Sequence, residues 1–404
     1  MTDARPGGRF ERHPRLTGAG LLAGALLLAE LALRLWAPVP LVFAHEMRRV
    51  HRYSRVARVD LRPSQSVRLR IDRSDGRPLF DFRLSTGPEG FRVGDAPSAE
   101  PQPGARFLHA IGDSYTMGWG VDAADSYPAR LARRLAPELQ VLNLGVDGFG
   151  AIGATAKSRG LAERYPPALS VYLFSPNDPD DDLLAASVAG RGGLAHAAHE
   201  TLDGLRRASY LAGLPFALRY RLQFQAGPAP DAAPTQAVSP ESLLLPEPPP
   251  SELPETAARD APPGLTALLG YRDFLAARGA RLLVLVLSNQ PESLQALRFC
   301  REQGIEARLF DVPPALRIPD EGHFNARGNE AVAGLVERLL RERQAEGRGP
   351  SRDPGSERPR VDGSPGDGPG RRGYGGLRGT GLRHAPTRRA DRAGSPPTTV
   401  PTGR

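Results

Sequence analysis

The sequence predicts an α/β fold in which a parallel sheet of about five strands lies between layers of helices. Short apolar runs that are typical of buried strands occur at residues 106–111, 139–142, 169–174, 281–287 and 307–310. Helical stretches lie between and after them, at residues 124–135, 265–277, 292–303 and 326–343. Nearly continuous apolar strands that alternate with helices indicate a parallel sheet that is covered on both faces.

An apolar segment, residues 16–33, precedes this region and follows four arginines. Eighteen helical residues rise about 27 Å, close to the thickness of the hydrocarbon core of a bilayer. We expect a transmembrane signal anchor over residues 16–36, with residues 1–15 cytoplasmic and the later residues periplasmic or extracellular. A signal peptide cleaved near residues 42–44 is the alternative. Five arginines soon after the segment weaken the charge asymmetry that sets its orientation.

Three further regions complete the expected organisation. Residues 37–104 are expected to hold a linker and a small β-hairpin, because apolar residues alternate on either side of an Asp-Gly pair. A folded domain follows over residues 105–344, and an insertion at about 183–263 interrupts it. The insertion begins with a helical part and ends in a Pro-rich part that cannot build a core, and a Gly/Pro-rich tail at 345–404 is expected to be disordered.

Charge and cysteine content exclude several classes of function. The net charge is +8, but residues 345–404 hold twelve Arg against six Asp or Glu, so the other 344 residues carry only +2. The high isoelectric point therefore reflects a basic tail, and no nucleic-acid partner is expected. Cys300 is the only cysteine, which excludes intramolecular disulfides and zinc sites built from paired cysteines. The oligomeric state is left open.

Four polar motifs follow predicted strands, and each supplies one part of a serine-hydrolase site. Ser114 follows the first strand, Gly145 the second and Asn177 the third, while Asp320 and His323 follow the fifth. Ligands of open parallel sheets bind outside the carboxyl ends of the strands, so we expect these residues to meet at one edge.

The residue types fit nucleophilic catalysis. Ser114 becomes a nucleophile when a base removes its proton, and His323 is the histidine placed to do so. Asp320 is expected to accept the Nδ1 proton of His323 and so direct Nε2 toward Ser114. The backbone N–H groups of Ser114 and Gly145 and the side-chain amide of Asn177 are the expected oxyanion donors.

Each motif also has an ordinary structural reading. Ser114 could be a helix N-cap, Gly145 part of a turn, and the His323 loop a helix cap. His196 and His199 have the helical spacing of metal ligands, but no third ligand is evident, so we expect a solvated helix face and no metal or cofactor.

The four blocks resemble those of the SGNH, or GDSL, hydrolase family, in the form seen in membrane-anchored bacterial members. The resemblance is carried by the Gly-Asp-Ser-Tyr-Thr-Met-Gly-Trp-Gly-Val block, by the Ser-Thr-Gly-Pro-Glu-Gly-Phe-Arg segment before it, and by the Asp-x-x-His block followed by Gly-Asn. The four name-giving residues of the family would be Ser114, Gly145, Asn177 and His323. One departure is Ser175-Pro176, since the family usually has a glycine two residues before its Asn.

This resemblance implies a flavodoxin-like three-layer α/β/α fold and hydrolysis of carboxylic esters, commonly of lipids or O-acetylated sugars, without a metal. The sequence therefore predicts a membrane-anchored serine esterase. Two alternatives remain open: an acyltransferase acting on an envelope glycan with the same residues, and a non-catalytic protein that binds glycan in the same pocket.

Overall fold

The computed structural model describes residues 13–94, 104–223, 238–249, 251, 253 and 262–346. The predictions made for the first twelve residues, for most of the Pro-rich part of the insertion and for the tail after residue 346 lie outside the described residues.

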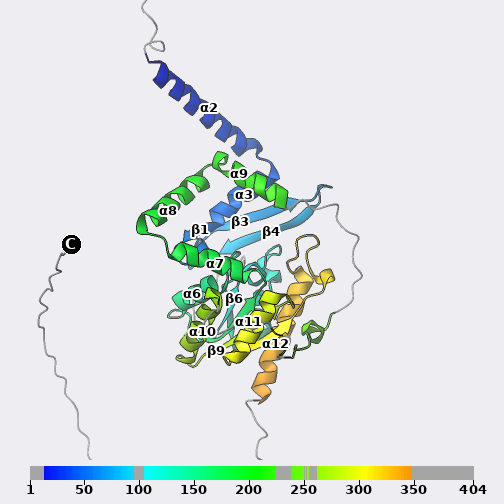
Figure 1. Ribbon diagram of the computed structural model, residues 1–404. Helices are drawn as coiled ribbons and strands as arrows, with labels where there is room; N and C mark the ends of the chain where they lie inside the picture. Colours follow the sequence, from blue (N-terminus) through cyan, green and yellow to red (C-terminus); the bar gives the residue numbers. More distant parts are fainter. Residues whose placement is uncertain are drawn as a thin grey trace, which may run out of the picture. The chain divides into compact units, whose positions relative to one another are not determined.

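A mixed sheet of eight strands forms the centre of the fold (Figure 1). Its strands, in spatial order, are β10 (Glu306–Phe310), β9 (Arg281–Leu287), β8 (Pro167–Phe174), β6 (Phe107–Gly112), β7 (Gln140–Asn143), β5 (Arg92–Val93), β4 (Pro78–Thr86) and β3 (Ser66–Asp72). The five strands from β10 to β7 are parallel and coincide with the five apolar runs predicted from the sequence.

The order of the parallel strands fixes where a ligand can bind. Numbered among themselves along the chain, they run 2-1-3-4-5 across the sheet, which is the flavodoxin-like order. The direction of winding reverses between β6 and β8. The crevice outside the carboxyl ends of these two strands is the expected ligand site of such a sheet, and Ser114 and Asn177 follow these strands.

The predicted β-hairpin is present, but it is part of the main sheet rather than a separate unit. Strands β3 and β4 pair in antiparallel register and bury one apolar face. The two-residue strand β5 then pairs with β4 on one side and, through Arg92 opposite Asn143, with β7 on the other. The sequence could not show this junction because strand pairing between distant segments depends on tertiary contacts.

Helices cover both faces of the sheet. One face packs against α5 (Tyr127–Leu135) and α12 (Ala326–Glu346). The other packs against α6 (Ala151–Leu161), α10 (Pro263–Ala276) and α11 (Pro291–Glu302), and these helices with the sheet form the expected three layers.

The region expected to be a linker is folded. Helix α3 (Val39–Val50) buries an apolar face that includes Phe43, and strands β1 (His51–Ser54) and β2 (Arg58–Leu61) form a small antiparallel sheet after it. The phenyl ring of Phe43 is 1% exposed and packs edge-on against Trp119, at 6.2 Å between ring centroids. The apolar face of α3 therefore belongs to the core.

The first half of the insertion is helical, as predicted, and consists of α7 (Asp178–Ala189), α8 (Gly193–Ala208), a short 3₁₀ turn η2 (Leu211–Gly213) and α9 (Leu214–Gln223). The second half does contribute to the core, contrary to the expectation from its composition. Leu243, in the 3₁₀ turn η3 (Pro240–Leu243), is fully buried, and the next residue bridges to Phe310 of β10.

The predicted apolar helix is α2 (Pro14–Trp36), which is long and apolar enough to cross a membrane by length and composition (Figure 1). Its side chains are almost all exposed in the structure. Its one acidic residue, Glu30, accepts hydrogen bonds from the backbone N–H groups of Tyr210 and Leu211, each at 3.0 Å. The connection between α8 and α9 therefore contacts the last turns of α2.

Candidate active site

The turn from β6 into helix α4 (Ser114–Met117) positions Ser114. Gly112 has a φ of 150°, and a Cβ there would lie 2.5 Å from Thr116 Oγ1 and 2.9 Å from the carbonyl oxygen of Leu173, so only glycine fits. Asp113 caps the helix, because its Oδ1 accepts the N–H of Tyr115 at 2.9 Å. The N-cap is thus an aspartate, and the hydroxyl of Ser114 is left for another partner.

That partner is the imidazole of His323. Ser114 Oγ lies 2.7 Å from His323 Nε2, although the two residues are 209 positions apart in the sequence. Both side chains are partly exposed, which leaves them accessible to a substrate. The structure therefore brings together the nucleophile and the base predicted from the sequence.

The carboxylate on the other side of His323 is not the predicted one. Oε1 of Glu321 lies 2.5 Å from His323 Nδ1, and its Oε2 accepts the backbone N–H of His323 at 3.0 Å. The Glu321 side chain is only 3% exposed, so water competes little for these contacts. An ionised Glu321 stabilises the tautomer with a proton on Nδ1, in which Nε2 can accept the proton of Ser114.

The predicted contact between Asp320 and His323 is replaced by an ion pair. Asp320 has a φ of 66°, in the left-handed region that Asp tolerates better than most residues, and its carboxylate lies 2.6 Å from a guanidinium nitrogen of Arg73. The same guanidinium donates to the carbonyl oxygen of Pro319 at 3.0 Å. Arg73, from the loop between β3 and β4, therefore holds the loop that carries His323.

A second arginine holds the other side of this loop. Arg317 donates to the carbonyl oxygen of Gly322 at 2.9 Å and to that of Val312 at 2.8 Å. The His323 ring is also flanked by aromatic rings, Tyr115 at 4.5 Å and Trp119 at 6.2 Å between centroids. These contacts restrict the orientation of the imidazole, which a general base requires.

Gly145 packs against the backbone of Thr116 and Met117 in α4. A Cβ on Gly145 would lie 2.2 Å from the backbone nitrogen of Met117, so a side chain is excluded. Its N–H donates at 3.2 Å to Oδ1 of Asn143, whose Nδ2 donates to the carbonyl oxygen of Met117. The N–H predicted to stabilise an oxyanion is thus occupied by a neighbouring side chain, and its catalytic role stays a prediction.

Asn177 lies at the same edge of the sheet, at the start of α7. Its Oδ1 accepts from Ser175 Oγ at 2.9 Å, and its Nδ2 donates to Asp181 Oδ2 at 3.0 Å. The side chain is exposed, and an amide nitrogen carries two protons, so one bond to Asp181 still permits donation to a ligand. Ser175, which stands where a glycine was expected from the resemblance, is what orients the amide.

Ser175 also joins two buried carboxyl groups behind the site. Its hydroxyl lies 2.7 Å from Asp113 Oδ2 and 2.8 Å from Asp178 Oδ1, and the other oxygen of Asp178 accepts a hydrogen bond from Tyr172. Ser175 has one hydroxyl proton, so it donates to only one of these two carboxylates or Asn177 Oδ1 at a time. Burial raises the pKa of Asp113 and raises that of Asp178 well above its usual range, which favours a carboxyl proton within this cluster. This network ties the loop after β6 to the loop after β8.

The histidines considered as metal ligands have other roles. His196 is buried, not solvated as expected, and its Nδ1 lies 2.8 Å from the hydroxyl of Tyr53. His199 Nε2 lies 2.6 Å from a guanidinium nitrogen of Arg191. Within the described ranges no group of three or more His, Cys, Asp or Glu side chains is placed to hold a metal ion.

No family model and no curated protein matches the chain. Among solved structures it is similar to a member of the lipolytic protein G-D-S-L family from Veillonella parvula, 12% identical over 59% of this chain and 99% of that one, with a TM-score of 0.33. It is also similar to the esterase EstA from Pseudoalteromonas sp., 11% identical over 59% and 99%, TM-score 0.34, and to AlinE4, an SGNH-hydrolase family esterase, 16% identical over 60% and 98%, TM-score 0.28. Because these sequence identities and TM-scores are low, the residue roles given below are argued from the geometry of this chain.

Proposed function

We propose that this protein is a serine esterase that hydrolyses a carboxylic ester of a lipid or an O-acetylated glycan. The observation that carries the proposal is the chain of hydrogen bonds from Ser114 Oγ through the His323 ring to Glu321, at 2.7 and 2.5 Å. Such a chain activates a hydroxyl that is otherwise a weak nucleophile.

Catalysis follows from the proton positions in this chain. Ser114 Oγ attacks the ester carbonyl while His323 Nε2 takes its proton, and the buried carboxylate of Glu321 stabilises the imidazolium that forms. His323 then returns the proton to the leaving alcohol. Water attacks the resulting acyl-enzyme by the same steps, which releases the acid and restores Ser114.

Three groups support the assignment of an oxyanion site beside Ser114. The N–H of Ser114 belongs to the first turn of α4, where backbone donors have no partner within the helix. The Gly145 N–H and the Asn177 amide are the other candidates, and each must exchange or share its present acceptor when substrate binds. Removing one oxyanion donor typically costs about 100- to 1000-fold in rate.

We infer further that α2 remains attached as a membrane anchor, with the catalytic domain on the outer side. Cleavage near residues 42–44 would cut α3 at Phe43, in the core, and would remove Leu41, which is 1% exposed. It would also remove Glu30, which accepts from Ser209 Oγ at 2.9 Å and from two backbone N–H groups. The four arginines before α2 support the orientation.

The proposal is tested with the full-length protein in a neutral detergent. Wild-type protein should hydrolyse p-nitrophenyl acetate and be labelled by a fluorophosphonate, and Ser114→Ala should lose both. Ser126→Ala is a matched control, since Ser126 is the N-cap residue before α5 and its hydroxyl, among the described residues, bonds only the carbonyl oxygen of Ala123. Full turnover by Ser114→Ala would reject the assignment, and failure of folded wild-type protein to take the label would favour the glycan-binding alternative.

A further inference from the structure

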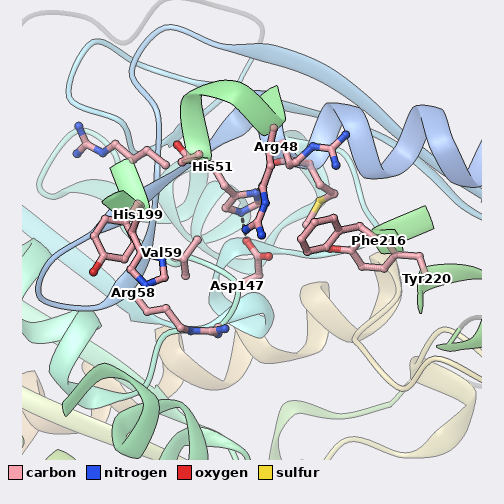
Figure 2. A pocket seen from close by; sticks show the side chains of 14 residues that line it. Arg48, His51, Arg58, Val59, Asp147, His199, Phe216 and Tyr220 are labelled. Carbon is pink, nitrogen blue, oxygen red and sulfur yellow. Dashed lines mark hydrogen bonds and ion pairs between the residues drawn. The ribbon is translucent and has the colours of Figure 1, made fainter. Parts of the chain in front are cut away.

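A pocket of about 370 Å³ lies between helices α3, α8 and α9, strands β1 and β2, and the loop after β7. Figure 2 shows Phe216 and Tyr220 on one side, Arg58 and His199 on the other, and Arg48 between them. Two of its walls, α8 and α9, come from the insertion. The proposed reaction does not use these side chains.

The acidic side chains that line this pocket are already paired. Asp147 lies 2.5 Å from Nε2 of His51, and the pKa of His51 is raised despite burial because Asp147 and the carbonyl oxygen of Met47 favour its charged form. Asp203 lies 2.5 Å from a guanidinium nitrogen of Arg62. Each carboxylate therefore already has an ion-pair partner, and Asp203 acts on Arg48 only through space.

Two arginines of the pocket have no such partner. The Arg48 and Arg206 guanidinium carbons lie 5.6 and 5.3 Å from the centre of the Phe216 ring. All three guanidinium nitrogens of Arg48 are buried, and none makes a hydrogen bond in the part of the chain that the structure describes. Within the same part, the two acids of α8 pair with other arginines, Glu200 with Arg55 and Asp203 with Arg62, and no ion pair includes Arg206. Burial lowers the pKa of Arg48, and the charge of Arg206 adds to this effect, while Tyr220, Asp203 and Glu30 oppose it.

Two neighbouring cations that lack an anion are costly in a desolvated site, and an aromatic ring offsets only part of this cost. Carboxylate and phosphate groups are the ligands that guanidinium recognises best, since they accept two parallel N–H bonds. These two arginines therefore favour binding of an oxyanion that the described residues do not supply.

The pocket is connected to the proposed oxyanion site through two loops. Asp147 and Gly148 line the pocket and follow Gly145 by two and three residues. Arg58 lies 3.5 Å from Asp181 Oδ1, and the other oxygen of Asp181 accepts from Asn177. A molecule bound in the pocket thus touches Asp147 and Gly148, which follow Gly145 in the chain, and Arg58, which pairs with the Asp181 that accepts from Asn177.

We propose that Arg48 and Arg206 bind a carboxylate or phosphate group carried by the ester substrate, so that the enzyme selects anionic esters. This rests on the proposed function, because it assigns a substrate class to that site. Arg206 supplies the contact nearer solvent, and the guanidinium group of Arg48, which lies buried between Gly213 and Phe216, becomes a second contact when its side chain shifts toward the ligand.

The first test compares two esters of equal acyl length, mono-p-nitrophenyl adipate and p-nitrophenyl hexanoate, with full-length protein in neutral detergent. The ratio of their kcat/KM values should fall about tenfold in Arg48→Gln or Arg206→Gln and about a hundredfold in the double variant, since each loses a charge-assisted contact. Arg341→Gln, an exposed arginine on α12, should leave the ratio unchanged. Thermal unfolding identifies any variant that fails to fold. If Arg48→Gln fails to fold, Arg206→Gln still tests the proposal, because Arg206 lies outside the core.

The second test measures binding without catalysis, by calorimetric titration of adipate and of inorganic phosphate into Ser114→Ala. Affinity for both should fall at least tenfold when the two arginines are replaced. If wild-type protein hydrolyses neither ester, the esterase proposal fails. The titration still measures anion binding in the pocket, because it does not depend on catalysis. Unchanged anion affinity in the double variant would reject the anion site. Native mass spectrometry with added phosphatidylglycerol tests whether the bound anion is a lipid headgroup rather than part of the substrate. Lipid adducts that depend on the two arginines, together with an unchanged ratio of kcat/KM for the two esters, would overturn the substrate assignment.

Discussion

Glu321 contacts His323 twice, through Oε1 at 2.5 Å from the ring Nδ1 and through Oε2 at 3.0 Å from the backbone nitrogen. A carboxylate held in this way fixes both the tautomer and the orientation of the ring. Asp320, which precedes it, is occupied by Arg73. The two neighbouring acids therefore have separable roles, and mutation distinguishes them.

Glu321→Gln should lower kcat about 10⁴-fold, because the amide can no longer hold the Nδ1 proton and stabilise the imidazolium. Asp320→Asn should cost less than about tenfold, since its carboxylate only positions the loop. Steady-state kinetics on p-nitrophenyl acetate measures both. The reverse ranking, with Asp320→Asn the more damaging variant, would restore the residue predicted from the sequence.

Gly145→Ala should destabilise the protein by about 3 kcal/mol or more and abolish activity, because its Cβ would lie 2.2 Å from the backbone nitrogen of Met117. Gly160→Ala is the matched control. A Cβ at Gly160, in α6, meets no atom within 4 Å, so this change should stabilise the protein by about 0.5–1 kcal/mol. Denaturant unfolding of the two variants gives both values, and a stable, active Gly145→Ala would contradict the packing described.

The His51–Asp147 pair should make stability depend on pH. Both ring nitrogens of His51 face acceptors, Met47 O at 2.6 Å and Asp147 at 2.5 Å, so the native state favours the doubly protonated ring. The raised pKa of His51 means that this stabilisation is fully present below about pH 6.5 and is lost as pH rises through the native-state value. The lowered pKa of Asp147 has the opposite sense and matters only in acid.

His51→Gln should therefore lower the melting temperature more at pH 6 than at pH 9. The comparison is made between wild type and variant at each pH, which cancels contributions from other groups. An equal difference at the two pH values would show that His51 is neutral in the native protein.

Retention of α2 is tested with an epitope tag placed before residue 1 and another after residue 404. The mature protein should carry both tags and fractionate with membranes, since removal of Phe43 and Glu30 would open the core and free the α8–α9 connection. A membrane-free band that carries only the C-terminal tag would show that the segment is a cleaved signal peptide.

The side of the membrane can be read from one engineered thiol. Cys300 is fully buried, and burial raises its pKa to about 12, so it should not react with maleimides in the native protein. In Thr201→Cys, the new thiol lies on the exposed surface of α8. A membrane-impermeant maleimide should label it without prior lysis once the outer barrier is permeable to the reagent. Labelling only after lysis of the inner membrane would place the domain in the cytoplasm.

Much of the fold was readable because its parallel strands are buried on both faces. Each of the five strands appears in the sequence as an apolar run, with turn residues and helical stretches on either side of it. The composition of a few residues is therefore enough to identify each strand. The turn at Gly112 and the close packing at Gly145 also leave a local trace, since a side chain at either position would clash. Ser114 and His323 could be paired in advance because parallel strands place their carboxyl ends at one edge.

The choice between Asp320 and Glu321 could not be read in this way, because both acids lie within three residues of His323. It depends on Arg73, 247 positions away from Asp320 in the chain. The junction of the hairpin with β7 and the burial of Leu243 were missed for the same reason. The residues of one segment do not indicate which distant residue they will contact after folding.

The chain by itself determined its strands, its apolar helix and the residues that could perform acyl transfer, since these follow from local pattern and from the rules of a parallel sheet. Tertiary structure alone decided which carboxylate orients the base and how Asn143 and Asp181 hold the candidate oxyanion donors. It also decided that Arg48 and Arg206 converge on one ring without an ion-pair partner among the described residues. The reason is physical: hydrogen bonds and charge balance depend on distances of a few ångströms between segments far apart in sequence, and local propensity carries no record of those distances.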